Sequence, residues 1–459
     1  MLFNSLDFAV FLPIVFVLYW FVTKHNLKLQ NALIVASSYV FYGWWDWRFL
    51  SLIIFSTFLD YSIGCRLKNE ENQKIRKTLL WTSIIVNLGF LGVFKYYNFF
   101  LENFIAAFSF FGQDIQPNSL NIILPVGISF YTFQTLSYTI DVYKKKLEPT
   151  EDLVAFSAFV CFFPQLVAGP IEKAIILLPQ IESKRSFDFN HGKSGIWLVT
   201  YGMFKKIVIA DNLAPIIDKF YATPSFSVVN LTEFIVSIFA YSIQIYCDFS
   251  GYSDIAIGVA LLFGIKLSTN FKQPYFSSNA VEFWHRWHIS LSTWFRDYVF
   301  IPLGGSKEGL TKNVRNILIV FLVSGLWHGA EWTFVIWGVG HFIYYFFDRF
   351  IIKNKSSSLI SKLLCFVLVS ILWIPFRATD TSQFLSLLLA LPESSMFGIP
   401  FGKFVMIKLL FLLAAFISYE IYLSKKESPE NLIFHTTFLI IISSIFGNFS
   451  HNAFVYFQF

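Results

Sequence analysis

Three of the eight histidines lie where an imidazole could do chemistry: His285, His288 and His328. His328 follows the apolar run 317–326 and has Trp327 and Trp332 nearby. The run predicts a helix at membrane depth, where an ionisable side chain is costly and a functional role is the default hypothesis. A buried imidazole stays neutral, which is the form that accepts a proton. We therefore expect His328 to act as a general base.

Two other interpretations of these histidines stay open. His328 could be a structural residue that hydrogen-bonds a carbonyl, although Gly325 and Gly329 favour function because they would leave space beside the ring for a substrate. Glu282, His285 and His288 are spaced by three, so they could share a helix face and resemble a zinc site, with His328 as a further ligand. The i, i+4 pair and the cysteines of a strong zinc motif are missing, so we expect no metal site.

Other reaction classes have little support. The sequence contains no G-x-S-x-G, P-loop or dinucleotide fingerprint, which argues against a serine hydrolase and against nucleotide-driven transport. The four cysteines are scattered in apolar surroundings without a C-x-x-C pair. Five basic residues precede the His328 helix and could bind the phosphates of coenzyme A or a phosphopantetheine arm, or could be the ordinary cytoplasmic excess of basic residues: Arg286, Arg296, Lys307, Lys312 and Arg315.

Two stretches must position these groups. Polar residues, among them Asp248 and Asp254, interrupt the apolar run 244–258, which predicts a broken helix beside a cavity. The stretch 283–305 combines Arg, His and Trp with apolar residues at every third or fourth position. It predicts one amphipathic helix that ends at Pro302 and Gly304.

The whole chain has the composition of a membrane protein. Of 459 residues, 56% are hydrophobic and only 14% are charged, against about 25% charged in a soluble domain. Apolar stretches recur along the chain and predict a single all-α membrane domain, 1–459, with about 11 or 12 spans, some broken or re-entrant. Residues 1–8 lack the positive charge of a signal peptide, so the first span is expected to stay. The net charge of +6 sits in loops, which excludes a nucleic-acid partner.

Several segments in order resemble the membrane-bound O-acyltransferase family, in its bacterial branch of alginate and peptidoglycan O-acetylation proteins. They are 124–146 (LPVGISFYTFQTLSYTIDVYKKK), 164–171 (PQLVAGPI), 210–215 (ADNLAP), 244–258 (QIYCDFSGYSDIAIG), FWHRWHISLSTWFRDY with PLGG, SGLWHGAEWTFVIWG, and 454–459 (FVYFQF).

The resemblance implies the roles of several residues. The histidine of the family's S-G-L-W-H-G-A pattern falls on His328 and that of its R-W-H-I-S-L-S pattern on His288, which makes these two the expected catalytic residues. His285 departs from the pattern, since an arginine is expected there. Residues near the two histidines are expected to bind substrate or donor: Trp287, Arg296, Ser324 and Trp327.

The resemblance also implies a fold and a function. We expect a ring of helices around a central tunnel in a bacterial inner membrane, without a cofactor. The enzyme would move an acyl group, most simply acetyl, from a cytoplasmic thioester (acetyl-coenzyme A or an acyl carrier) to hydroxyls of alginate-like exopolysaccharide or peptidoglycan, with a periplasmic SGNH-type acetyltransferase as partner. The alternatives are D-alanyl transfer to teichoic acid and, in a different class, a transporter or flippase with a polar pathway along Asp141, Asp248, Asp254 and His328.

Overall fold

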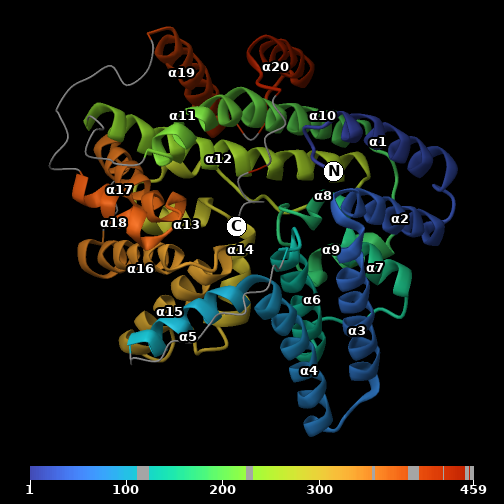
Figure 1. The fold of residues 1–459 in the computed structure, drawn as a ribbon. Coiled ribbons are helices and arrows are strands. Elements are labelled where there is room, and N and C mark those ends of the chain that lie inside the picture. The colour runs from blue at the N-terminus through green and yellow to red at the C-terminus, as the bar shows by residue number, and fades with distance from the viewer. Residues whose placement is uncertain are drawn as a thin grey trace. The chain divides into compact units, whose positions relative to one another are not determined.

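The computed structural model describes residues 1–110, 123–223, 231–353, 357–390, 403–426, 428–449 and 454 (Figure 1). These residues form helices and no strand, which confirms the all-α class. They divide into two compact units: unit 1 is Met1–Gly192 with Val259–Ser268, and unit 2 is Lys193–Gly258 with Thr269–Phe459. The 454–459 segment of the resemblance lies outside the described residues except for Phe454.

Unit 1 consists of apolar helices, several of which begin at a polar cap. Ser5 accepts a hydrogen bond from the Phe8 amide (3.2 Å), and Asp152 accepts bonds from the Val154 and Ala155 amides (2.8 and 3.1 Å). The elements are α1 (Leu6–Val17), η1 (Leu18–Val22), α2 (Leu27–Asp46), η2 (Trp47–Phe49), α3 (Leu50–Asn69), α4 (Gln73–Leu91), η3 (Gly92–Tyr96), α5 (Tyr97–Phe110), α6 (Ile128–Tyr143), α7 (Leu153–Cys161), α8 (Phe163–Leu166) and α9 (Ala174–Glu182).

A buried carboxyl group joins α3, α4 and α6, which lie side by side (Figure 1). Asp60 of α3 accepts hydrogen bonds from Ser83 and Asn87 of α4, the second at 2.8 Å, and from Thr139 of α6 at 2.9 Å. All four side chains are buried. Hydrogen bonds of this kind between helices add to close packing where lipid gives no hydrophobic driving force.

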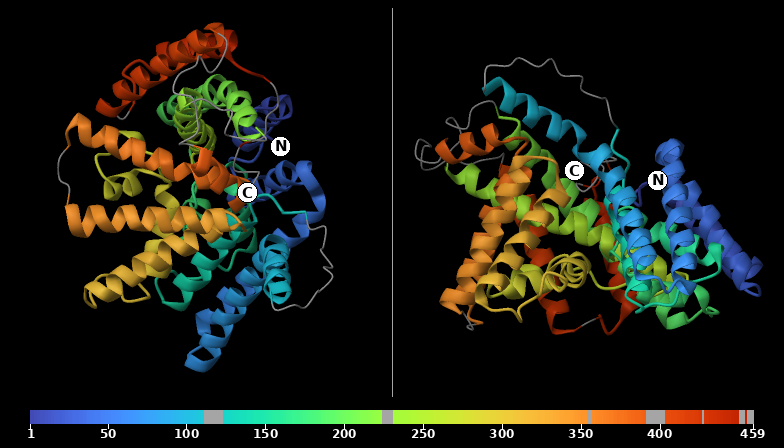
Figure 2. Two further views of the ribbon diagram at one scale, coloured as in Figure 1. Left: turned by 60° about the vertical axis from the view of Figure 1, so that its left-hand side comes forward. Right: turned by 90° about the horizontal axis from the view of Figure 1, so that it is seen from below.

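Unit 2 holds both predicted catalytic histidines. In it α15 packs against α16 and α16 against α17, and the three run side by side in Figure 2. The elements that lie wholly or mostly in unit 2 are α10 (Phe189–Met203), η4 (Phe204–Ala210), α11 (Asp211–Tyr221), α12 (Leu231–Leu262), η6 (Pro274–Phe276), α13 (Ala280–Arg286), α14 (Ile289–Phe295), η7 (Arg296–Phe300), α15 (Leu310–His328), α16 (Trp332–Phe346), η8 (Phe347–Ile352), α17 (Leu359–Arg377), α18 (Thr381–Ala390), α19 (Lys403–Lys425) and α20 (Leu432–Phe446).

The prediction of a broken helix at 244–258 is wrong, because α12 runs without interruption through that stretch. Its acidic residues are paired with lysines of η4. Asp248 forms an ion pair with Lys206 of η4 (2.8 Å), and Asp254 forms one with Lys205 of η4 (2.8 Å). With their charges balanced by lysines, these residues do not require the backbone to unwind.

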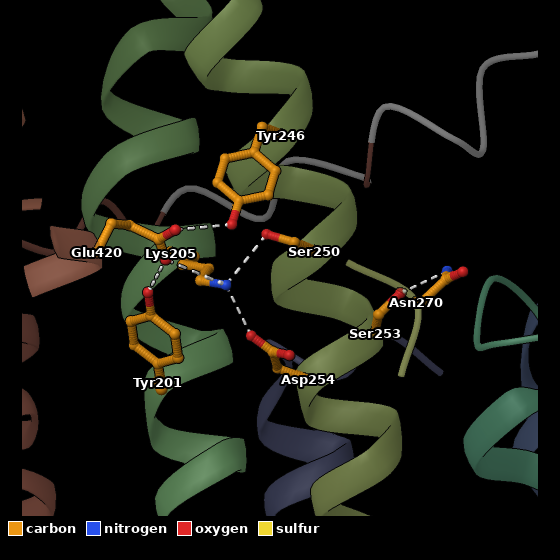
Figure 3. Close-up of polar contacts among 8 residues, drawn as sticks. All are labelled: Tyr201, Lys205, Tyr246, Ser250, Ser253, Asp254, Asn270 and Glu420. Atoms are coloured by element: carbon orange, nitrogen blue, oxygen red, sulfur yellow. Dashed lines mark hydrogen bonds and ion pairs between the residues drawn. The ribbon is translucent and has the colours of Figure 1, made fainter. Parts of the chain in front are cut away.

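The Lys205 pair extends into a larger buried polar cluster (Figure 3). Glu420 of α19 accepts hydrogen bonds from the hydroxyls of Tyr201 and Tyr246, the second at 2.9 Å, and its carboxylate lies 4.0 Å from the Lys205 ammonium. The side chains of Lys205 and Glu420 are 4% and 5% exposed. The cluster therefore links α19 to η4, α10 and α12 through charged groups and tyrosine hydroxyls.

Six helices of the described residues are long and apolar enough to cross a membrane, and two apolar helices are shorter. The chain is therefore a multi-pass membrane protein. Two of the six segments each contain two helices: Leu27–Asn69 holds α2 and α3, and Gln73–Phe110 holds α4 and α5. Other apolar stretches form short buried helices instead of long ones. Examples are α7 and α8, of 9 and 4 residues.

Candidate active site

The stretch predicted as one amphipathic helix is two short helices, and the break falls at a predicted catalytic residue. Helix α13 ends at Arg286 and α14 begins at Ile289. Between them His288 has φ +43°, in the left-handed region, which costs a residue other than glycine about 1–3 kcal/mol. Strain of this kind persists where the surrounding structure fixes it, and it gathers at functional sites.

The break places the His288 ring in the interior, with 1% of the residue exposed. Its Nδ1 lies 3.1 Å from the Oδ1 of Asn270, and the Phe249 ring lies edge-on at 4.8 Å between ring centres. His288 belongs to none of the candidate membrane spans. Burial lowers its pKa to about 3, because the cationic form loses its hydration.

His328 is the last residue of α15, and it is 5% exposed. Its ring centre lies 5.0 Å from Trp337 and 5.3 Å from Phe376. The centres of the His288 and His328 rings are 6.4 Å apart, and Trp327 packs against both, at 5.9 and 5.0 Å. Two residues 40 positions apart in the sequence thus form one pair in an aromatic enclosure.

The expectation that Gly325 and Gly329 leave space for a substrate is wrong. A Cβ at Gly325 would collide with the backbone carbonyl of Phe334, and one at Gly329 would collide with the Phe334 ring. These glycines instead let α15 approach α16 closely. Their role is to seat the end of α15, where His328 lies.

A pocket of about 500 Å³ is lined by residues that flank His288 and His328 in the sequence, although neither of these two histidines lines it. It contains Ser324, one helical turn before His328, and Ile289, directly after His288. Its polar wall includes Arg296 and Arg349, and Arg349 donates a hydrogen bond to the Tyr345 hydroxyl (2.5 Å). The lining residues are Val281, Trp284, His285, Ile289, Leu291, Ser292, Thr293, Phe295, Arg296, Phe300, Ile317, Val320, Phe321, Ser324, Tyr345 and Arg349.

The structure distributes the other predicted site residues over different places. Trp327 packs against both histidines, whereas Trp287 packs against Phe271 and Trp373, at 5.0 and 4.9 Å. Of the five basic residues that could bind phosphate, Arg296 lines the pocket. Arg286 and Lys312 form ion pairs with neighbouring glutamates (2.6 and 2.8 Å).

The zinc-like trio does not converge. His285 lines the pocket, His288 lies in the aromatic enclosure, and Glu282 pairs with Arg286 (2.6 Å). Across the described part of the chain, no three histidine, cysteine or acidic side chains lie close enough to hold a metal ion.

Sequence reasoning missed two residues near the site. Asn270 contacts His288 but precedes it by 18 residues and belongs to no recognised pattern. His341, expected to be unremarkable, is fully buried on α16, edge-on to Trp284 and Trp337. Neither of its ring nitrogens has a hydrogen-bond partner within the described residues. In the sequence, His341 lies four residues after Trp337, which places the two side chains on the same face of a helix.

Known proteins are similar to this chain over much of its length. The model of the membrane-bound O-acyltransferase family matches residues 149–370. A probable alginate O-acetylase of Azotobacter vinelandii is 39% identical over 83% of this chain and 76% of the relative. The peptidoglycan O-acetyltransferase of Helicobacter pylori is 34% identical over 84% and 79%, whereas the teichoic acid D-alanyltransferase of Bacillus subtilis is 30% identical over 51% and 62%. This chain belongs to the membrane-bound O-acyltransferase family.

Proposed function

We propose that this enzyme transfers an acetyl group from a cytoplasmic thioester to a hydroxyl of a cell-envelope polysaccharide, and that His328 and His288 carry the proton. The observation that supports this most is the pair itself: two buried imidazoles, 6.4 Å apart at their centres, in an enclosure of aromatic rings. Dry surroundings suit the reaction, because water would hydrolyse the thioester.

The transfer needs only groups that the chain and its substrates supply. His328 takes the proton of the acceptor hydroxyl while the oxygen attacks the acetyl carbonyl carbon. The carbon–sulfur bond then breaks, and the departing thiolate receives the proton. The products are an ester and a free thiol, and His328 returns to its neutral form. His288 shares this proton with His328. General-base assistance of this kind contributes about 10²- to 10⁴-fold.

The pocket lined by Ser324 and Arg296 is proposed to receive the donor. Its inner part, at Ser324, would face the acetyl end, and its arginines would bind phosphate groups of coenzyme A or of a carrier arm. Arg296 has a 60% exposed side chain and lies 2.8 Å from the Asp297 carboxylate, so it can reach an anion at the mouth.

The acceptor and partner are proposed from the relatives. Relatives that match most of this chain are a probable alginate O-acetylase and a peptidoglycan O-acetyltransferase, so we propose an exopolysaccharide or peptidoglycan acceptor on the far side of the membrane and a periplasmic SGNH-type acetyltransferase that completes the transfer. D-alanyl transfer to teichoic acid is less favoured, since that relative matches about half of the chain. Family membership sets the transporter reading aside, and Asp248 and Asp254 form ion pairs with lysines.

A radiolabel assay tests the reaction class. Purified protein with labelled acetyl-coenzyme A is expected to release free thiol, and label is expected to reach polysaccharide acceptors when the periplasmic partner is added. The same protein with a D-alanyl carrier thioester is expected to give no transfer. Transfer of D-alanine with no turnover of acetyl-coenzyme A would contradict the proposal.

The donor site has a sharper test. Replacing both pocket arginines (Arg296→Ala with Arg349→Ala) should raise the KM for acetyl-coenzyme A by roughly tenfold or more and leave kcat nearly unchanged, because binding contacts to a remote phosphate are lost. A short acetyl thioester without phosphates should show no change in KM. Lys312→Ala, outside the pocket, is the control. An equal loss with both donors would contradict phosphate binding.

A further inference from the structure

The amide of Asn270 is fully buried between α12 and the break that carries His288. Its Oδ1 lies 3.1 Å from His288 Nδ1, 3.3 Å from the Ser290 backbone nitrogen and 2.8 Å from the Ser290 hydroxyl. Its Nδ2 donates a hydrogen bond to the Ser253 hydroxyl at 3.1 Å, as Figure 3 shows. Both the oxygen and the nitrogen of the Asn270 side-chain amide thus have hydrogen-bond partners.

These contacts fix which end of the amide is the oxygen. A backbone N–H can only donate a hydrogen bond, so the atom that faces the Ser290 nitrogen must be the acceptor Oδ1. The same oxygen faces His288 Nδ1. Since an amide oxygen accepts only, Nδ1 must carry a proton, and in a neutral ring the other nitrogen, Nε2, then holds the lone pair.

Backbone hydrogen bonds hold the segment around Asn270 against the break between α13 and α14. The Ile289 amide donates a hydrogen bond to the Asn270 carbonyl (2.9 Å), and the Lys272 amide donates one to the Arg286 carbonyl (2.9 Å). The segment that carries the amide is therefore attached on both sides of the strained His288.

We propose that Asn270 is a positioning residue that holds His288 as the Nδ1–H tautomer, so that Nε2 is its proton-accepting atom. The inference rests on the proposed function and deepens it, because it says how His288 shares the proton of the pair. In this tautomer neutral His288 cannot donate a hydrogen bond from Nε2. The oxyanion that forms on the acetyl carbonyl must therefore be stabilised by another group.

The groups against the His288 ring define what a pH profile would report. Within the described residues they include Phe249 from α12, Asn270 and Phe271 from the segment before η6, and Trp327 and His328 from α15. Of these, His328 is titratable and the other four are not. A carboxylate placed at position 270 would thus act on His288 from the Nδ1 side and stabilise its cation.

The first test needs no activity. Nitrogen NMR of 15N-histidine-labelled protein, with the His288 signals identified by their loss in His288→Asn, is expected to show a protonated Nδ1 and an unprotonated Nε2. Asn270→Ala should give the other tautomer or a mixture, and Asn270→Asp should restore Nδ1–H. A protonated Nε2 in the unmodified protein would overturn the inference, whatever the substrate proves to be.

The second test uses acetyl-coenzyme A turnover. Asn270→Asp should shift the acid limb of the pH profile upward by about one to three units, and Asn270→Ala should lower kcat by roughly 10²-fold. Asn316→Ala is the matched control. It removes two hydrogen bonds that the buried Asn316 side-chain amide donates to the Leu303 and Gly305 carbonyls (3.1 and 3.0 Å), away from the histidines. Its profile should keep the acid limb of the unmodified protein. An unshifted limb in folded Asn270→Asp would overturn the inference, while absence of turnover in every protein would refute the proposed function alone.

Discussion

At the scale of single residues, the site depends on two imidazoles that differ in backbone setting. His328 ends a regular helix, whereas His288 adopts a left-handed conformation between two short helices. The second setting is costly, and the fold retains it because the resulting break turns the ring into the aromatic enclosure. A substitution at position 288 that tolerates the left-handed backbone can therefore remove the imidazole without disturbing the fold.

The variant His288→Asn is such a substitution. Asparagine accepts left-handed backbone more readily than most residues, and its side-chain amide can still donate toward Asn270. The variant should keep an apparent melting temperature close to that of the unmodified protein and lose about 10²- to 10⁴-fold in acetyl transfer. His191→Asn, at a side chain 42% exposed, is the control. Near-normal transfer by His288→Asn would exclude a role for its imidazole.

The pH dependence of His288 follows from its burial. Its pKa falls from about 6.5 in an unfolded chain to about 3 in the fold, so the native state binds fewer protons below pH 6.5. The neutral form of His288 therefore predominates at every pH well above 3. Its contribution to stability is full above pH 6.5 and is lost as pH falls toward 3. Urea titrations should give a lower free energy of unfolding at pH 5 than at pH 7. The difference between the two pH values should be smaller in His288→Asn.

The residue types at the site could be predicted from sequence, but their contacts could not. An ionisable ring beside apolar sequence singles out His328, and the family pattern adds His288. Asn270 offers no such signal, because its role comes from where the chain returns in space. The prediction that the two glycines beside His328 leave space for a substrate is wrong because a sequence does not show which helix packs against them, and here it is α16.

At the scale of elements, the end of α15 is positioned by close contact with α16. Gly325 meets the backbone of Phe334, and a Cβ built on Gly338 of α16 would lie 3.7 Å from the Gly325 Cα. Small residues that let two helices approach are the usual means of packing within a membrane. The contact fixes the axial position of His328.

The substitution Gly325→Ala should therefore push α15 away from α16. We expect a lower apparent melting temperature and at least a tenfold loss of acetyl transfer, because a small misplacement of the base costs rate. Gly89→Ala is the matched control. It is also in a helix interior, a Cβ there meets nothing within 4 Å, and alanine should stabilise by up to about 1 kcal/mol. Equal melting temperatures for the two variants would contradict the packing role.

Sequence patterns located the irregular elements only in part. Polar residues within an apolar run suggested a break at 244–258, but α12 is continuous and the break lies at His288. The acids that prompted the prediction are paired with lysines some 40 to 50 residues earlier in the chain. Periodicity within a short window cannot show a partner at that distance.

At the scale of the whole molecule, composition established a multi-pass helical membrane protein, and the described residues confirm it. What composition cannot give is how charged residues are accommodated inside. Lys205, Asp254 and Glu420 answer this by forming one buried cluster that links three parts of unit 2. Removing one member of such a group leaves an uncompensated charge.

The variant Lys205→Met tests this cluster. Loss of the ammonium should leave Asp254 and Glu420 without a cation and destabilise the fold by about 3–5 kcal/mol. The double variant Lys205→Met with Asp254→Leu should recover part of the loss, as measured by denaturant unfolding in detergent. Lys68→Met breaks an exposed pair with Glu151 and should change stability little. If Lys205→Met were as stable as Lys68→Met, the cluster would not support the fold.

The central claim is that the histidine pair carries acyl transfer, and kcat/KM for acetyl-coenzyme A in His328→Ala, His288→Asn and the double variant tests it most directly. Residues that act as one unit are not additive, so the double variant should be hardly slower than the slower single variant, and His328→Ala should lose at least about 10²-fold while remaining folded. Undiminished turnover in folded His328→Ala would contradict the account.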